Sequence, residues 1–100
     1  MATHGKARTT TIRALGNREP FKRHGFNMWA SEGATMLQGR LPEAYWEQYS
    51  VLAKNGSIAY TVLSYGTPIA WVTLGGTIII PDVKYSVTTT HHQSLCKVYL

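Results

Sequence analysis

The 100-residue sequence has one cysteine, Cys96, and few charged side chains, which make up 15% of the chain. A single cysteine excludes an intramolecular disulfide framework and any zinc site that needs two thiolates from one chain. It indicates a reducing compartment, and we expect a cytoplasmic protein. The segment from Met1 to Leu15 lacks a long apolar run, so the sequence predicts neither a secretory signal nor a transmembrane helix.

Motifs that carry chemistry are also scarce. The sequence has no glycine-rich phosphate loop and no Gly-x-Ser-x-Gly nucleophile elbow. Its five carboxylates are too scattered to nominate an acid and base pair; they are Glu19, Glu32, Glu43, Glu47 and Asp82. The sequence therefore predicts a protein that is not an enzyme and needs no cofactor.

One weak constellation stands against that prediction. His92 and Cys96 are four residues apart in a predicted helix and could present an imidazole and a thiol to one point. A zinc site would need further ligands, for which His4, His24, His91 and Asp82 are the available residues. We favour the structural interpretation, in which Cys96 is buried as a small hydrophobe and no metal is bound.

Positive charge is concentrated in the first 25 residues. Six basic residues and one acidic residue give this segment a net charge of +5; the basic residues are Lys6, Arg8, Arg13, Arg18, Lys22 and Arg23. From residue 26 onward four basic and four acidic residues cancel, so the charge of the whole chain belongs to this segment. Clustered cations attract nucleic-acid phosphates or acidic protein surfaces. A solubilising, partly flexible tail is the alternative.

Length and pattern predict one α+β domain over residues 1–100. We expect irregular chain over 1–8, short strands at 9–15 and 35–41, and an aromatic-rich loop at 18–33. Two helices are predicted, 42–54 after Pro42 and 91–99 after a Thr90–Gln93 capping box. Between them, residues 57–80 predict an antiparallel meander within a sheet of three to five strands. The basic segment is expected to be an addition to this folded platform.

The turns of the meander predict its register. A two-residue turn at Gly66–Thr67 and another at Gly75–Gly76 would place Trp71 between Val62 and Ile80 on one face of the sheet. The opposite face would carry other apolar side chains, so both faces need cover. The helices and the N-terminal aromatic residues are the available cover.

Cations alternate with aromatic side chains after residue 17, a pattern typical of surfaces that grip phosphates and stack on bases. The same residue types anchor protein interfaces. The alternative is that the aromatic residues complete a small core. The candidate binding residues are Arg13, Arg18, Phe21, Lys22, Arg23, Phe26 and Trp29.

The runs Ser64-Tyr65-Gly66-Thr67-Pro68-Ile69-Ala70-Trp71 and Pro81-Asp82-Val83-Lys84-Tyr85-Ser86-Val87-Thr88-Thr89-Thr90-His91-His92-Gln93 resemble small uncharacterised proteins of actinobacterial phages and prophages. The resemblance covers roughly residues 60–94 and carries no catalytic residues. It implies a small accessory protein that binds a host protein or a protein–nucleic acid complex in the bacterial cytoplasm, such as an inhibitor of host defence or an anti-CRISPR protein. Direct binding of DNA or RNA by the basic segment is the alternative.

Overall fold

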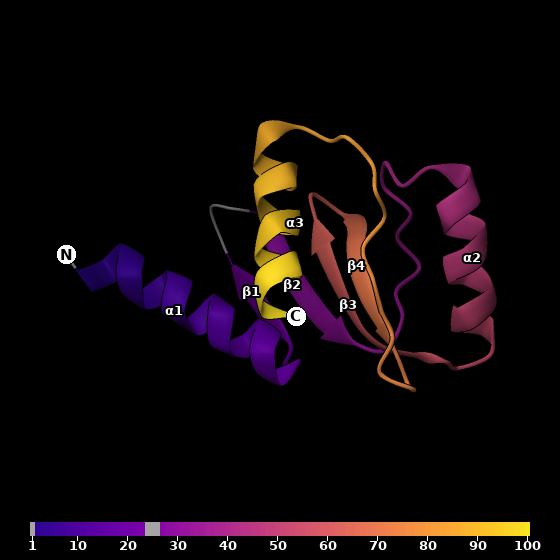
Figure 1. The fold of residues 1–100 in the computed structure, drawn as a ribbon, viewed down its shortest axis with the longest axis horizontal. Helices are drawn as coiled ribbons and strands as arrows, with labels where there is room; N and C mark the ends of the chain where they lie inside the picture. Colours follow the sequence, from indigo (N-terminus) through magenta and orange to yellow (C-terminus); the bar gives the residue numbers. More distant parts are fainter. Residues whose placement is uncertain (1, 24–26) are drawn as a thin grey trace.

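The structure, a computed structural model, describes residues 2–23 and 27–100, and the side chains of residues 10–22 and 27–100. In chain order its elements are α1 (Ala2–Asn17), β1 (Phe21–Arg23), β2 (Met28–Glu32), α2 (Glu43–Lys54), β3 (Ile58–Ser64), β4 (Thr67–Thr73), β5 (Ile78–Ile79) and α3 (Val87–Tyr99). The strands form one antiparallel sheet in sequence order (Figure 1). The predicted α+β class is confirmed, with a sheet of five strands.

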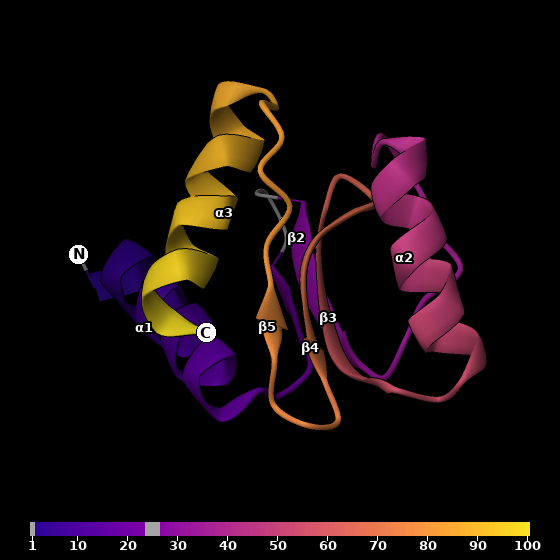
Figure 2. The ribbon, with the colours of Figure 1, turned by 45° about the vertical axis from the view of Figure 1, so that its right-hand side comes forward.

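Helices cover the two faces of this sheet separately. Figure 2 shows the sheet from its edge, with α1 and α3 on one side and α2 on the other. The larger core cluster lies under α1 and α3 and includes Leu15, Val62 and Leu95, while the cluster under α2 is centred on Tyr49 and Trp71. Each face therefore buries its own apolar set, as expected for a three-layer arrangement.

The predicted strand at 9–15 and the predicted irregular chain at 2–8 are wrong, because residues 2–15 belong to helix α1. Met1 lies outside the described residues. Three consecutive threonines favour extended structure, but Thr11, Ala14 and Leu15 are three and four residues apart and are buried together. That spacing places them on one helical face against α3 and β1. Packing of this face outweighs the weak β preference of threonine.

The basic segment is not an addition to a finished platform, which corrects the sequence-based expectation. Leu15 is 0% exposed within the larger core cluster, and Phe21 packs against that cluster from β1. The Tyr60 hydroxyl donates to the Glu19 carbonyl at 2.7 Å and fastens the connection after α1 to β3. The end of α1 and strand β1 are therefore part of the folded body, while the beginning of α1 extends away from it (Figure 1).

Two segments between residues 18 and 41 also differ from the prediction. The predicted loop at 18–33 contains both β1 and β2, which pair with Lys22 opposite Trp29. Residues 35–41, a predicted strand, have no regular structure. The Tyr49 hydroxyl of α2 accepts a hydrogen bond from the Thr35 N–H at 2.8 Å. In a strand this N–H would instead bond to a neighbouring strand.

The predicted register of the meander is wrong by one residue. The turn between β3 and β4 is at Tyr65–Gly66, where both residues have positive φ, rather than at Gly66–Thr67. Trp71 pairs with Thr61 rather than Val62, because the turn position alone would move the pairing by two residues and the irregularity between Val62 and Leu63 moves it back by one. On its other side Trp71 pairs with Ile79 rather than Ile80. A one-residue shift moves side chains to the other face, so Val62 lies under α3 while Trp71 lies under α2.

The two predicted helices are confirmed in position, with a correction to the start of the second. Helix α2 begins directly after Pro42. Helix α3 begins at Val87, four residues before the predicted start, because Ser86 is its N-cap and accepts the Thr89 N–H at 3.3 Å. The Thr90–Gln93 pair is therefore not the cap, and Gln93 instead donates to the Pro81 carbonyl at 3.0 Å.

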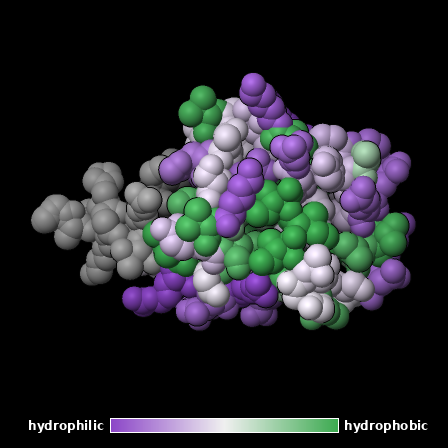
Figure 3. Space-filling model, viewed as in Figure 1, coloured by the Kyte–Doolittle hydropathy of each residue, from purple (hydrophilic) through white to green (hydrophobic). Residues whose placement is uncertain are grey.

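Apolar side chains remain on the surface beside β5, a strand of two residues at the edge of the sheet. Leu74 and Ile78 are exposed, and Ile79 and Ile80 are half-buried. Figure 3 shows a hydrophobic area in this region, between α3 and α2, with hydrophilic side chains around it.

Candidate functional site

The two arginines of the basic segment whose side chains are described have different surroundings. Arg13 is exposed on α1. Arg18, the residue after the helix, has φ of 55°, and its guanidinium donates to the Leu100 carbonyl at 3.4 Å. Arg18 therefore helps to attach the C-terminus to the end of α1, while Arg13 is available to a partner.

Three of the predicted binding residues come together at one edge of the sheet. Phe21, Lys22 and Trp29 line a shallow pocket of about 420 Å³ with Pro20 and Ala30; we call this the β1–β2 pocket. Lys22 is exposed, and Trp29 is half-buried beside it on the neighbouring strand. On the sheet face that α2 covers, this helix packs over Ile58 of β3 and Trp71 of β4. The pocket thus combines a cation with apolar surface.

The other two predicted residues add little to this geometry. Arg23 is the last residue of β1 and faces Met28 across the ladder. Phe26 lies outside the described residues. The structure therefore gathers Phe21, Lys22 and Trp29, and it leaves Arg13 on a separate element.

The His92 and Cys96 pair faces the core. Both are buried, and the His92 Nδ1 atom lies 2.7 Å from the Ser64 Oγ atom. Burial raises the pKa of Cys96 from 9.0 to about 12, so its thiol is protonated at neutral pH and is a poor nucleophile. Helical spacing correctly predicted that the two side chains share a face, and His91 lies on the exposed side.

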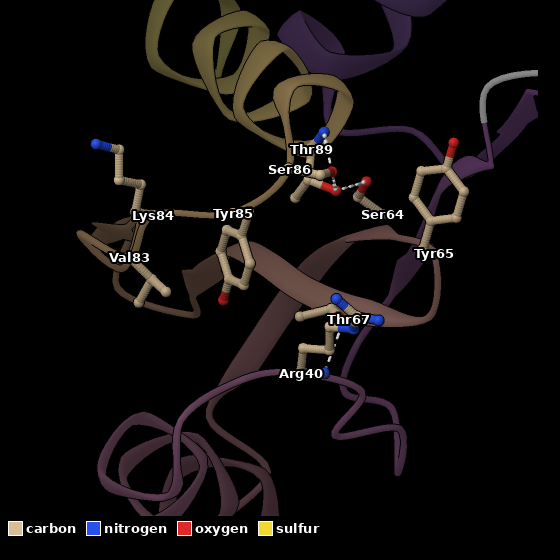
Figure 4. A pocket seen from close by; sticks show the side chains of 9 residues that line it. All are labelled: Arg40, Ser64, Tyr65, Thr67, Val83, Lys84, Tyr85, Ser86 and Thr89. Carbon is tan, nitrogen blue, oxygen red and sulfur yellow. Dashed lines mark hydrogen bonds between the residues drawn. The ribbon is translucent and has the colours of Figure 1, made fainter.

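A second pocket was not predicted from the sequence. It has a volume of about 640 Å³ and lies between the β3–β4 turn and the start of α3 (Figure 4); we call it the α3 pocket. Its lining residues are Arg40, Ser64, Tyr65, Thr67, Val83, Lys84, Tyr85, Ser86 and Thr89. Two of these nine residues are cationic and none is acidic. The sequence signal for this pocket is the N-cap Ser86 with the threonines that follow it, and the predicted helix start at residue 91 lies beyond it.

Hydroxyl groups connect the α3 pocket to the buried histidine. Ser86 Oγ donates to Thr89 Oγ1 at 3.3 Å, and Thr89 Oγ1 lies 3.1 Å from Ser64 Oγ, which in turn contacts His92. This chain of hydrogen bonds fixes the start of α3 against the end of β3. Ser64 is 1% exposed, which argues for a structural role of this serine and histidine pair rather than nucleophilic attack.

The described part of the chain also bears on metal binding and on membrane crossing. No group of three or more His, Cys, Asp or Glu residues there is placed to hold a metal ion. Among the same residues, no helix has both the length and the apolar character needed to cross a bilayer.

The fold defines a small α+β protein with one five-stranded antiparallel sheet and helices on both faces. The chain belongs to a family of unknown function (DUF8033), whose model matches residues 17–96. No curated protein and no solved structure matches the chain. The matched range begins at the last residue of α1, so it includes both pockets and leaves Arg13 outside.

Proposed function

We propose that this protein is a non-enzymatic binding module, a phage-type accessory protein in the bacterial cytoplasm. It docks on a host protein through the surface formed by Arg13 of α1 and the β1–β2 pocket, which we call the basic end. The observation that carries the proposal is the β1–β2 pocket, in which Lys22 adjoins the apolar surface of Phe21 and Trp29. An aromatic anchor with a cation at its rim is the usual composition of a protein interface.

The charge distribution supports an acidic partner surface. The first 25 residues hold the entire net charge of +5, and the exposed Arg13 and Lys22 lie on α1 and β1. Opposite charge on the partner would speed encounter and orient the two proteins, while the apolar pocket would supply contact area. The basic end is positively charged, so a DNA-mimicking mode of inhibition does not fit it.

The resemblance to phage and prophage proteins over roughly residues 60–94 supports the biological setting. The buried Cys96 and the enclosed Ser64 support a non-enzymatic role, because neither presents a reactive group to solvent. A modulator of host machinery needs an interface and no catalytic group.

The test is affinity capture from nuclease-treated bacterial host lysate with two charge-matched variants. Arg13→Gln with Lys22→Gln removes two exposed cations from the basic end, and Lys54→Gln with Lys97→Gln removes two exposed cations elsewhere. We expect the wild type and the second variant to recover one specific protein that the first variant loses. Recovery of no specific protein after nuclease treatment, or equal recovery by both variants, would contradict the proposal.

Direct binding of nucleic acid is the second candidate, and the shape of α1 favours it. This helix carries Lys6, Arg8 and Arg13 and extends away from the body (Figure 1). A basic helix of this kind can lie along a phosphate backbone. If all six basic residues contacted phosphates of duplex DNA, a plot of the logarithm of affinity against the logarithm of salt concentration would have a slope of about −5.

A fluorescent oligonucleotide titration at several salt concentrations tests this second candidate. A steep salt dependence that weakens in an Arg18→Ala, Lys22→Ala, Arg23→Ala variant is expected if the candidate is right. Binding unchanged by these three substitutions would rule it out. The control is Lys54→Ala with Lys97→Ala, which lowers the net charge outside the basic segment.

A further inference from the structure

The α3 pocket has the lining of a site for an anion. Arg40 enters from the loop before α2, and Lys84 stands at the rim (Figure 4). Neither cation is balanced by an acidic residue among the nine that line the pocket. The Arg40 side chain is exposed, and no hydrogen bond or ion pair to another described residue occupies its guanidinium. The pocket therefore holds a free positive charge in a concave setting.

One buried hydrogen-bond donor lies at the same pocket. Tyr85 has a hydroxyl oxygen that is buried and has no hydrogen-bond partner among the described residues, and Figure 4 shows it on the side where Arg40 lies. Burial raises the pKa of Tyr85, and the nearby Tyr45 raises it further, so this hydroxyl keeps its proton. A buried donor without a partner is costly, and a ligand oxygen would satisfy it.

The position of Arg40 is built into the fold. Its backbone N–H donates to Thr67 Oγ1 at 2.8 Å. Gly39, directly before it, has φ of 55°, and a Cβ atom there would meet the Gly66 carbonyl oxygen at 2.6 Å. The loop is thus pressed against the β3–β4 turn at a place that only glycine allows, and this contact holds Arg40 at the pocket.

We propose that the α3 pocket binds a small phosphate monoester that also carries a planar ring, the class to which nucleotides belong. Arg40 and the Tyr85 hydroxyl would hold the phosphate oxygens, because guanidinium groups bind phosphate through charge-assisted hydrogen bonds. Tyr65 and Tyr85 stand on opposite sides of the pocket and offer aromatic surface to the ring (Figure 4). A volume of about 640 Å³ exceeds what a bare phosphate fills and lies in the range of small-molecule sites.

The site does not depend on the proposed docking surface, because Arg40 and Tyr85 are outside the basic segment and the β1–β2 pocket. Isothermal titration with the purified full chain measures the binding. The probes are adenosine and uridine 5′-monophosphates, the nucleosides without phosphate, and a 5′-phosphorylated single-stranded oligonucleotide. We expect binding of a phosphate-bearing probe and none of the nucleosides. Tighter binding of the oligonucleotide than of the mononucleotides would identify a nucleic-acid end as the source of the phosphate.

Two variants locate the site. Arg40→Gln should weaken binding by about tenfold or more, since it removes a charge-assisted interaction. Tyr85→Phe should also weaken binding while leaving the urea midpoint unchanged or higher, because it deletes a hydroxyl that has no partner among the described residues. Lys97→Gln, the same loss of charge at the end of α3, should bind like the wild type. The proposal is overturned if no phosphate-bearing probe binds, if nucleosides bind equally well, or if Lys97→Gln loses as much affinity as Arg40→Gln.

Discussion

Replacing Gly39 with alanine should destabilise the protein far more than the same replacement at Gly33. Both glycines have positive φ, 55° and 73°, so each alanine incurs the left-handed penalty of about 1–2 kcal/mol. At Gly33 a Cβ atom would meet no atom of the described residues within 4 Å, whereas at Gly39 it would overlap the Gly66 carbonyl and approach the Thr67 Cα atom to 2.7 Å. Both of these Gly39 contacts are backbone atoms, which cannot rotate away.

Forcing the Gly39 loop off the β3–β4 turn adds roughly the cost of overpacking, about 1–3 kcal/mol. We therefore expect a loss of about 2–5 kcal/mol for Gly39→Ala and of about 1–2 kcal/mol for Gly33→Ala, measured by urea unfolding followed by circular dichroism. Gly39→Ala should also weaken binding of the phosphate probes, because Arg40 moves with the loop. Equal unfolding free energies for the two variants would refute the close contact between this loop and the turn.

Two further predictions concern the buried polar groups. Tyr49→Phe removes the hydroxyl that accepts the Thr35 N–H, so it should cost about 1–3 kcal/mol, while Tyr45→Phe should change the unfolding free energy by much less; similar values would contradict the role of the Tyr49 hydroxyl. Because the pKa of Cys96 is raised in the folded protein, the thiol ionises at lower pH in the unfolded chain than in the folded one. The contribution of the buried thiol to the free energy of unfolding is therefore full below about pH 9 and is lost as the pH rises toward about 12. A Cys96→Ala variant should lack this part of the alkaline decline, and rapid alkylation of native Cys96 at pH 8 would contradict its burial.

The sequence predicted the parts of the fold in which local pattern and packing agree. Helix α2 was predictable because Tyr45, Tyr49 and Leu52 repeat at helical spacing after Pro42. The meander was predictable from its glycine turns, but the register depended on whether Tyr65 or Gly66 came first in the turn. A tyrosine with positive φ is uncommon, so pattern alone favoured the wrong choice.

The N-terminal third was mispredicted because long-range contacts decide it. The threonines before Ile12 favour a strand in isolation, and only contact with α3 and β1 selects the helix. Lys22 and Trp29 were named as binding residues, but their pairing across two strands follows from a hairpin that the aromatic-rich loop concealed. The α3 pocket was missed altogether, since Arg40 and Tyr85 are 45 positions apart in the sequence and no local pattern connects them.

The most direct test of the proposed function is the affinity of a purified partner, recovered by the capture experiment, for the two charge-matched variants. Arg13→Gln with Lys22→Gln should weaken binding by about fivefold to thirtyfold, corresponding to about 0.5–1 kcal/mol for each charge, and the loss should shrink at high salt. Lys54→Gln with Lys97→Gln should leave the affinity within about twofold of the wild type, which is about 0.4 kcal/mol. Equal affinities for the two variants would contradict docking through the basic end.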